Sequence, residues 1–219
     1  MGSLADNNSA HTADLLQRHR AGDARALGEL LAGHRERLRH MAELRLDRRL
    51  RAQVSPDDVV RDACAGVPAR LAEYLADPRL PFFLWLRLLV GERLVALHRQ
   101  RLGAPPPGAG PEVALHRGAL PRASSAALAA RLLGQQAAAT QAAARAERLL
   151  RLQGAVNALG AVDREVVSLR HFEELSLAEA ALVLGIGEAQ AAKRYVAALK
   201  RLRDLLAALP GPPEAHRHG

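Results

Sequence analysis

The chain is poor in several residue types, and each shortage argues against a class of protein. Its single cysteine, Cys64, cannot form an internal disulfide and argues against a zinc site. The longest apolar stretch, Phe82 to Val90, is interrupted by Arg87 and is far shorter than the roughly 20 residues that span a bilayer. The polar opening residues carry no secretory signal. We therefore expect a cytoplasmic protein with no membrane segment, no metal and no cofactor.

The composition also argues against β-sheets and catalysis. Isoleucine occurs once and threonine twice, whereas alanine and leucine dominate, so we expect an all-α fold. The sequence contains no Gly-rich phosphate loop, Ser/His/Asp set or metal-spaced His/Cys cluster. Asp58 and Asp62 lie one helical turn apart, which suits an acid/base or metal pair, but the sequence offers no second ligand set. An enzyme is therefore not expected.

Positive charge is plentiful. Lysine and arginine number 31 against 23 acidic residues, giving a net charge of +8, and all but two of the basic residues are arginine. Arginine suits phosphate and guanine recognition, although heavy arginine use is also typical of a GC-rich genome. One cluster fits a phosphate or acidic-protein contact and an ordinary solvated surface equally well: Arg35, Arg37, Arg39, Arg45, Arg48, Arg49 and Arg51.

Proline, glycine and alanine divide the chain into two small helical domains. We expect an N-terminal helical domain over 13–103, a linker rich in those residues over 104–142, and a C-terminal four-helix domain over 143–208. Residues 1–12 are expected to be disordered.

Two segments of the N-terminal domain carry clear local signals. Ser55, Pro56, Asp57 and Asp58 form a helix start, because serine caps, proline fits the first turn and the acids complement the helix dipole. The helix from Phe82 to about 101 begins FFLWLRLLV, apolar on nearly every side, which predicts a position in the middle of a bundle. Its aromatic residues could stack on unpaired bases, but packing in the core is favoured.

The segment over 176–203 predicts a helix-turn-helix. Ser176 is a good N-cap with Glu179 three positions on, and Gly185 suits the left-handed conformation that ends many helices. The next helix, from Glu188, has two faces. An apolar face contains Ala191, Ala192, Tyr195, Ala198, Leu199, Leu202 and Leu206. The opposite, basic face contains Gln190, Lys193, Arg194, Ala197, Lys200 and Arg201. This pattern predicts a recognition helix for the DNA major groove.

Taken in order, these segments resemble a bacterial RNA polymerase sigma factor of the extracytoplasmic-function (ECF) class, in particular its arginine-rich, planctomycete-type branch. The resemblance covers roughly residues 13–207. SPDDVVRDAC resembles the helix that docks on RNA polymerase, and PFFLWLRLLVGERLVALHRQRL the helix for −10 recognition and strand opening. The segment from LGAVDREVV to KRLRDLL resembles the domain that binds the −35 element.

The resemblance implies a transcription initiation factor whose partners are core RNA polymerase, promoter DNA and, if one exists, an anti-sigma factor. It implies polymerase binding by Asp57, Asp58, Val59, Arg61 and Asp62. It implies DNA binding by Glu188, Gln190, Lys193, Arg194, Ala197, Lys200 and Arg201. Arg61 departs from the glutamine common at its position, and Gly187 from the usual serine or threonine cap.

Two other functions stay open at this point. A helix-turn-helix repressor or activator that never joins polymerase would bind paired half-sites as a dimer. A helical enzyme or adaptor would use Asp57, Asp58 and Asp62, and would lose its activity or its bound metal when Asp58 is replaced.

Overall fold

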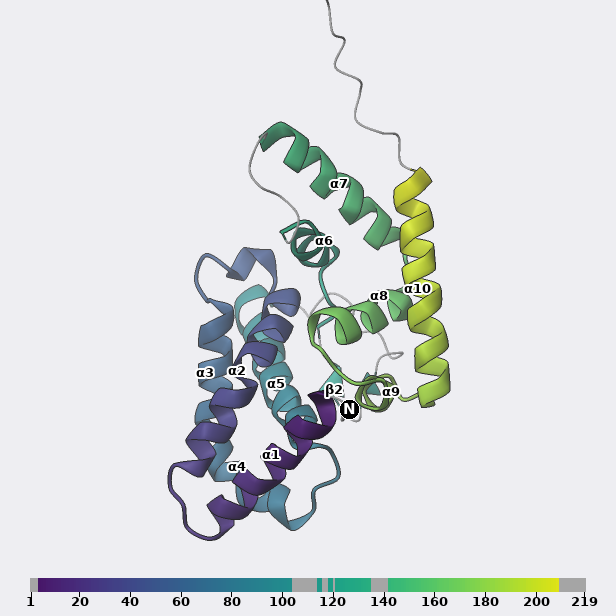
Figure 1. Ribbon diagram of the computed structural model, residues 1–219. Helices are drawn as coiled ribbons and strands as arrows, with labels where there is room; N and C mark the ends of the chain where they lie inside the picture. The colour runs from purple at the N-terminus through teal and green to yellow at the C-terminus, as the bar shows by residue number, and fades with distance from the viewer. Residues whose placement is uncertain (1–3, 104–113, 116–117, 120, 135–141, 209–219) are drawn as a thin grey trace, which may run out of the picture.

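The computed structural model describes residues 4–208 except for gaps at 104–113, 116–117, 120 and 135–141 (Figure 1). About half of the predicted linker over 104–142 falls in these gaps, and a helix, α6 (Ser125–Gly134), lies within the rest. The N-terminal helices are α1 (Leu4–Arg20), α2 (Ala26–Arg45), the 3-10 helix η1 (Arg48–Leu50), α3 (Pro56–Ala65), α4 (Val67–Ala76) and α5 (Phe82–Leu102). The C-terminal ones are α6 (Ser125–Gly134), α7 (Ala142–Ala158), α8 (Ala161–Val167), the π-helix η2 (Ser168–Phe172), α9 (Leu177–Leu184) and α10 (Glu188–Ala208).

The all-α prediction is confirmed. In the described part of the chain the only strands are β1 (Ala114–Leu115) and β2 (Gly118–Ala119), a two-residue antiparallel pair. The prediction of disorder over 1–12 is wrong from Leu4 onward, because α1 begins there. This helix packs against α2 and buries Leu15, which anchors the polar turns before it.

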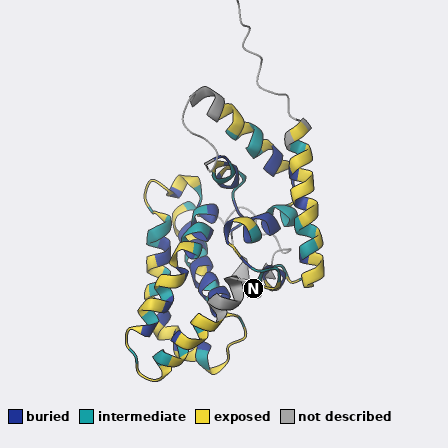
Figure 2. Cartoon of the chain, in the orientation of Figure 1, coloured by how far each residue is buried: buried dark blue, intermediate teal, exposed yellow. Residues whose placement is uncertain are grey.

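Helix α5 is the centre of the N-terminal bundle. It packs against α2 and α3, and most of its first nine residues are buried (Figure 2). Phe82 is 3% and Phe83 4% exposed. Burying such a side chain stabilises the fold by about 1.5–3 kcal/mol, which explains why this apolar run occupies the middle. The predicted position of the helix is confirmed.

Each half of the chain contributes side chains to the hydrophobic core of the other. Leu169, Leu175 and Val183 belong to the core of the N-terminal bundle. Leu44, near the end of α2, belongs to the core formed by the C-terminal helices. The backbone N–H of Ser124 also donates to the carbonyl of Leu44 at 2.8 Å. The two halves are therefore packed together over a mixed apolar and polar contact.

Four fully or almost fully buried charges lie at this contact, and we call them the buried ion cluster. Arg45 of α2 pairs with Glu165 of α8 and with Glu173, which directly follows η2. Arg87 of α5 donates from Nε to Glu173 Oε2 at 2.7 Å. The Ser168 hydroxyl donates to Glu173 Oε1 at 3.1 Å. Two positive and two negative charges thus balance one another away from water.

The guanidinium groups keep Glu173 ionised in spite of its burial. Burial on its own would raise the pKa of this carboxyl, but the charges of Arg45 and Arg87 outweigh it and lower the pKa to about 2. The π-helix contributes to the geometry, because the N–H of Glu173 bonds to the Ser168 carbonyl at 3.0 Å, five residues back. This wider turn carries Glu173 into the contact.

Arg37 makes a further link between the halves. Its guanidinium donates from Nε to the Glu173 carbonyl at 3.2 Å and from Nη2 to the Glu174 carbonyl at 3.1 Å. Its Cζ lies 3.7 Å from the centre of the Phe83 ring, which is a cation–π contact. The arginine cluster around α2 is therefore divided, with Arg37 and Arg45 turned inward to the C-terminal helices.

Candidate nucleic-acid interface

Helices α9 and α10 form a helix-turn-helix around Gly185. The hydroxyl of Ser176 accepts from the Glu179 N–H at 3.1 Å, and the Glu179 carboxylate accepts from the Ser176 N–H at 2.7 Å. Gly185 is left-handed, with φ 64°, and the N–H of Ile186 donates to the Ala181 carbonyl at 3.1 Å. The predicted cap and the predicted glycine stop are confirmed, and α10 follows directly after the turn.

Helix α10 lies along one edge of the molecule (Figure 1). Most of the predicted contact residues on it are exposed to solvent. Ala191 and Ala198 are 0% exposed and Leu202 is 6% exposed, so these residues define the side that faces α8 and α9. Six of the seven residues expected to bind DNA are exposed: Glu188, Gln190, Lys193, Ala197, Lys200 and Arg201.

Arg194 differs from this expectation. Its side chain is 39% exposed, and its Nη1 lies 3.7 Å from Oδ1 of Asp163 in the first turn of α8. The guanidinium is therefore directed partly toward the protein. To contact DNA, it would have to exchange this weak ion pair for a phosphate or a base.

The outward face of α10 is also rotated relative to the prediction. Leu199, assigned to the core, is 38% exposed, and Val196 is 65% exposed. At about 100° per residue, the buried side lies about 40° from the predicted one. Lys193, Val196 and Lys200 then occupy the centre of the outward face. Two ammonium groups beside an apolar side chain suit phosphate contacts and the methyl group of thymine.

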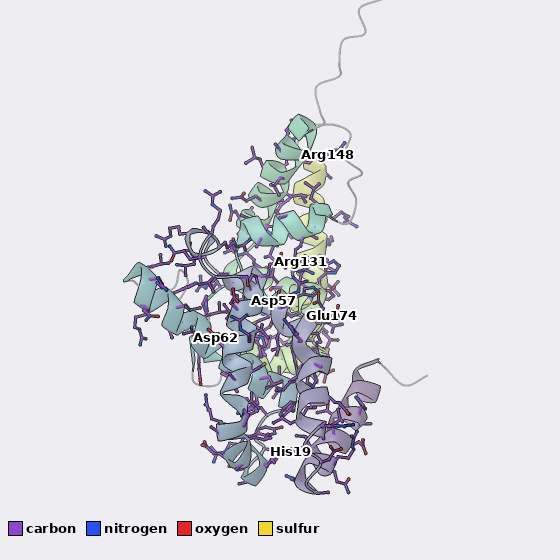
Figure 3. All side chains as sticks on the ribbon, turned by 90° about the vertical axis from the view of Figure 1, so that its left-hand side faces the viewer. His19, Asp57, Asp62, Arg131, Arg148 and Glu174 are labelled. Carbon is purple, nitrogen blue, oxygen red and sulfur yellow. The ribbon has the colours of Figure 1, made fainter. Side chains whose placement is uncertain are left out.

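The predicted polymerase-docking residues lie on α3, on the side of the molecule seen in Figure 3. Three ion pairs neutralise its acids: Asp57–Arg35 at 3.0 Å, Asp58–Arg61 at 2.6 Å and Asp62–Arg93 at 2.8 Å. Arg61 itself is exposed. Val59 is 0% exposed and packs in the bundle core, so it supports this face from beneath and does not reach a partner's surface.

Asp58 forms the capping box of α3 with Ser55, and these hydrogen bonds explain its low pKa. The Ser55 hydroxyl and backbone N–H donate to its carboxylate at 2.7 and 3.0 Å, and the Asp58 N–H donates back to Ser55 Oγ at 3.1 Å. These bonds, chiefly that from the Ser55 hydroxyl, and the Arg61 charge lower the pKa of Asp58 to about 2. A carboxylate that stays ionised in a helix cap is unsuited to proton transfer near neutral pH.

The aromatic residues near the start of α5 pack in the core. Tyr74 stacks on Trp85 with ring centroids 4.6 Å apart, and Phe82 lies edge-on to Tyr74 at 5.5 Å. Tyr74 is only 9% exposed, and its hydroxyl donates to the Leu80 carbonyl at 3.0 Å. The favoured prediction of core packing is confirmed, since these rings are held by one another.

The buried ion cluster was missed from sequence, although one signal pointed to it. Arg87 stands inside the apolar run FFLWLRLLV, where a lone cation requires a buried partner. That partner, Glu173, lies 86 residues away, and no local spacing connects the two.

Two further properties concern the described residues alone. No set of three or more His, Cys, Asp or Glu side chains comes together there in a way that could hold a metal ion. Each helix in those parts is too short or too polar to cross a membrane.

Comparison with known proteins finds a similarity in the C-terminal region. Residues 149–202 match the family model for sigma-70, region 4. The matched segment runs from the second half of α7 nearly to the end of α10. The search of curated proteins finds no match. A solved structure of CnrH in complex with the cytosolic domain of CnrY is similar to the chain, with 24% sequence identity and a TM-score of 0.51. The similarity covers 93% of this chain and 99% of that chain, and it concerns the fold.

Proposed function

We propose that the chain is an ECF-type sigma factor, a transcription initiation factor that binds core RNA polymerase and directs it to specific promoters. The match of residues 149–202 to sigma-70, region 4 is the observation that carries the proposal. In the proposed mechanism α10 enters the major groove of the −35 element. Lys193, Lys200 and Arg201 hold phosphates, and Gln190 contacts a base edge. Such a factor has no catalytic site of its own and acts in the cytoplasm.

In the same proposal the exposed face of α3 docks on the polymerase. Asp57, Asp58 and Asp62 present three carboxylates there beside the guanidinium of Arg61, and Val59 fixes the helix in the bundle. Tethering through the polymerase raises the effective concentration of each domain at its DNA element, so neither has to bind tightly alone. The domain limits 13–103 and 143–208, and the planctomycete-type branch, stay predictions.

We also propose an inhibitory protein partner, an anti-sigma factor. The similar CnrH structure is a complex with the cytosolic domain of CnrY. That complex supports a search for a comparable partner of this chain, which co-purification from the native cells would test.

A reconstituted run-off assay tests the main proposal. Purified chain is added to core RNA polymerase with a library of genomic fragments, and the 5′ ends of the transcripts are mapped. We expect transcripts from a small set of fragments, absent without either component. Binding of paired half-sites by a dimer of the chain, with no polymerase-dependent transcripts, would overturn the proposal and favour a polymerase-independent regulator.

A further inference from the structure

Helix α10 carries three small apolar side chains in line on its outward face, and we call them the methyl strip. Val196 is 65% exposed, Ala189 is exposed and Ala192 is partly exposed. At about 100° per residue, Ala189 and Ala192 lie about 20° and 40° to either side of Val196. With a rise of about 1.5 Å per residue, the strip is about 10 Å long. It occupies the first half of the helix.

Packing within the protein does not account for Val196. The side of α10 that faces α8 and α9 contains Ala191, Ala198 and Leu202, and Val196 lies about 160° from Ala198. Valine is a poorer helix former than alanine, because its branched side chain loses rotamer freedom in a helix. At this exposed site it therefore stabilises neither the helix nor the core. Its methyl groups are available to a ligand.

Cations border the methyl strip. Lys193 and Lys200 are exposed and lie about 60° and 40° to one side of Val196. Arg203 is exposed about 20° to the other side and pairs with Asp204 at 3.0 Å. Along the whole of α10, five lysines and arginines stand against two acidic residues. An apolar line bordered by positive charge complements the major groove of DNA, in which base edges lie between two phosphate backbones.

The chemistry of the groove indicates which base fits the methyl strip. Among the four bases of DNA, thymine alone presents a methyl group in the major groove, and alanine and other apolar side chains contact it there. The residues near the start of a recognition helix are those that meet base edges. The side chains of the strip have no hydrogen-bonding atom, so they cannot pair with the donors and acceptors of the other bases. They can bury a methyl group.

We propose that the methyl strip, chiefly Val196, recognises the C5-methyl group of thymine in the duplex that α10 binds. The proposal rests on the proposed function, because the −35 element is that duplex. It makes Val196 a residue that determines sequence specificity, whereas its cationic neighbours hold phosphates. The preference for thymine arises from the burial of apolar surface and needs no hydrogen bond.

Replacing thymine by deoxyuridine tests the proposal, because this change removes the methyl group and keeps every hydrogen-bonding atom of the base. The full-length chain, alone and on core RNA polymerase, first selects sequences from a library of random duplexes. Fluorescent duplexes of the selected sequence, with deoxyuridine at one thymine position at a time, are then compared by anisotropy. The variant is Val196→Ala. The control is Leu150→Ala, which removes a side chain on α7 that is 69% exposed.

We expect the wild-type chain to bind about fourfold less tightly when the thymine at Val196 loses its methyl group, which is the effect of one buried methyl. In Val196→Ala the two duplexes should differ by less than about twofold. The salt slope of binding should stay unchanged, because the phosphate contacts are kept. Leu150→Ala should discriminate as the wild type does. Thermal unfolding by circular dichroism verifies that both variants fold.

Three results would overturn the proposal. The first is equal binding of the thymine and deoxyuridine duplexes by the wild-type chain, or discrimination that persists unchanged in Val196→Ala. The second is a selection that enriches no sequence in either form of the experiment. The third is self-association of the chain that Val196→Ala abolishes, which would assign the methyl strip to a contact with a second copy.

Failure of this inference is distinguishable from failure of the proposed function. Polymerase-dependent transcripts without discrimination between thymine and deoxyuridine would remove the recognition of thymine and leave the initiation role. Discrimination that depends on Val196, without any such transcripts, would leave the recognition of thymine and remove the initiation role.

Discussion

Arg87 donates a 2.7 Å hydrogen bond from Nε to Glu173 Oε2, and the two side chains are 1% and 0% exposed. The pair joins the central helix of the N-terminal bundle to the residue that follows η2. It lies at the contact between the two halves. Two residues 86 positions apart in sequence thereby help to hold the two halves of the molecule together.

Removing the charge of Glu173 should destabilise the protein strongly. In Glu173→Gln the guanidinium groups of Arg45 and Arg87 lose their shared counter-charge, and breaking a buried pair costs about 3–5 kcal/mol of the free energy of unfolding. Urea unfolding at pH 7 measures this loss. The control is Glu174→Gln, at an exposed neighbouring position (Figure 3), which should change the free energy by less than about 0.5 kcal/mol. Equal effects of the two substitutions would contradict the role of the cluster.

Acid should weaken the fold through His34. Burial, together with the nearby charge of Arg37, lowers the pKa of His34 from 6.5 to about 4. The unfolded chain then binds the proton more readily, so stability is complete above pH 6.5 and falls until about pH 4, by about 3 kcal/mol for this group. His34→Leu should remove that part of the pH dependence. The comparison is with His171→Gln, an exposed position, and identical pH profiles for wild type and His34→Leu would refute the assignment.

Two left-handed residues should respond in opposite directions to substitution. Gly185 has φ 64° at the end of α9, so Gly185→Ala should cost about 1–2 kcal/mol. Glu174 has φ 56° and is not a glycine, so Glu174→Gly should relieve strain and stabilise the fold by up to about 1 kcal/mol. The melting temperatures of the two variants, each compared with that of the wild type, measure these changes. A gain for the first substitution or a loss for the second would show that backbone conformation does not dominate there.

The Asp163–Arg194 pair gives a prediction about DNA binding. Asp163→Asn should free Arg194 for the promoter, and because a partly exposed pair is worth at most about 1 kcal/mol, affinity should rise about two- to fivefold. The gain should vanish in Asp163→Asn/Arg194→Ala, which separates the release of Arg194 from the simple loss of a negative charge. A gain that survives in the double variant would remove Arg194 from the contact surface.

Lys193 and Lys200 should each contribute to affinity at the −35 element. Their ammonium groups are exposed at the centre of the outward face of α10. Each alanine substitution should reduce the salt slope of promoter binding by about 0.9 and weaken all −35 sequences alike, because phosphate contacts carry no base preference. Anisotropy with wild-type and altered −35 duplexes provides the measurement. A change in the preferred sequence would instead make that lysine a base reader.

Local signals were sufficient to predict much of this molecule. The caps at Ser55 and Ser176, the stop at Gly185 and the central position of α5 follow from interactions within a few residues or from one apolar run, and all were predicted correctly. Such features depend on local backbone hydrogen bonds and on helix periodicity, and both can be predicted from neighbouring residues in the sequence. The predicted docking and DNA-contact residues themselves await the experiments above.

Features that depend on distant partners were not predictable in the same way. Helical periodicity places residues relative to one another on α10, but its absolute rotation depends on how α8 and α9 pack against it. Leu199, which was assigned to the core, is consequently 38% exposed. Arg45 was one of several similar arginines along α2, and only the positions of Glu165 and Glu173 determine that it turns inward.

The buried ion cluster carries no net charge, and this determines how the contact between the halves responds to ionic strength. Parting the halves would return two cations and two anions to water, so no net charge would be uncovered and dissolved salt would have little influence on that opening. Nucleic-acid binding by a cationic surface declines steeply with salt. A titration with potassium chloride would therefore distinguish detachment from DNA, which it promotes, from domain separation, which it leaves almost unaltered.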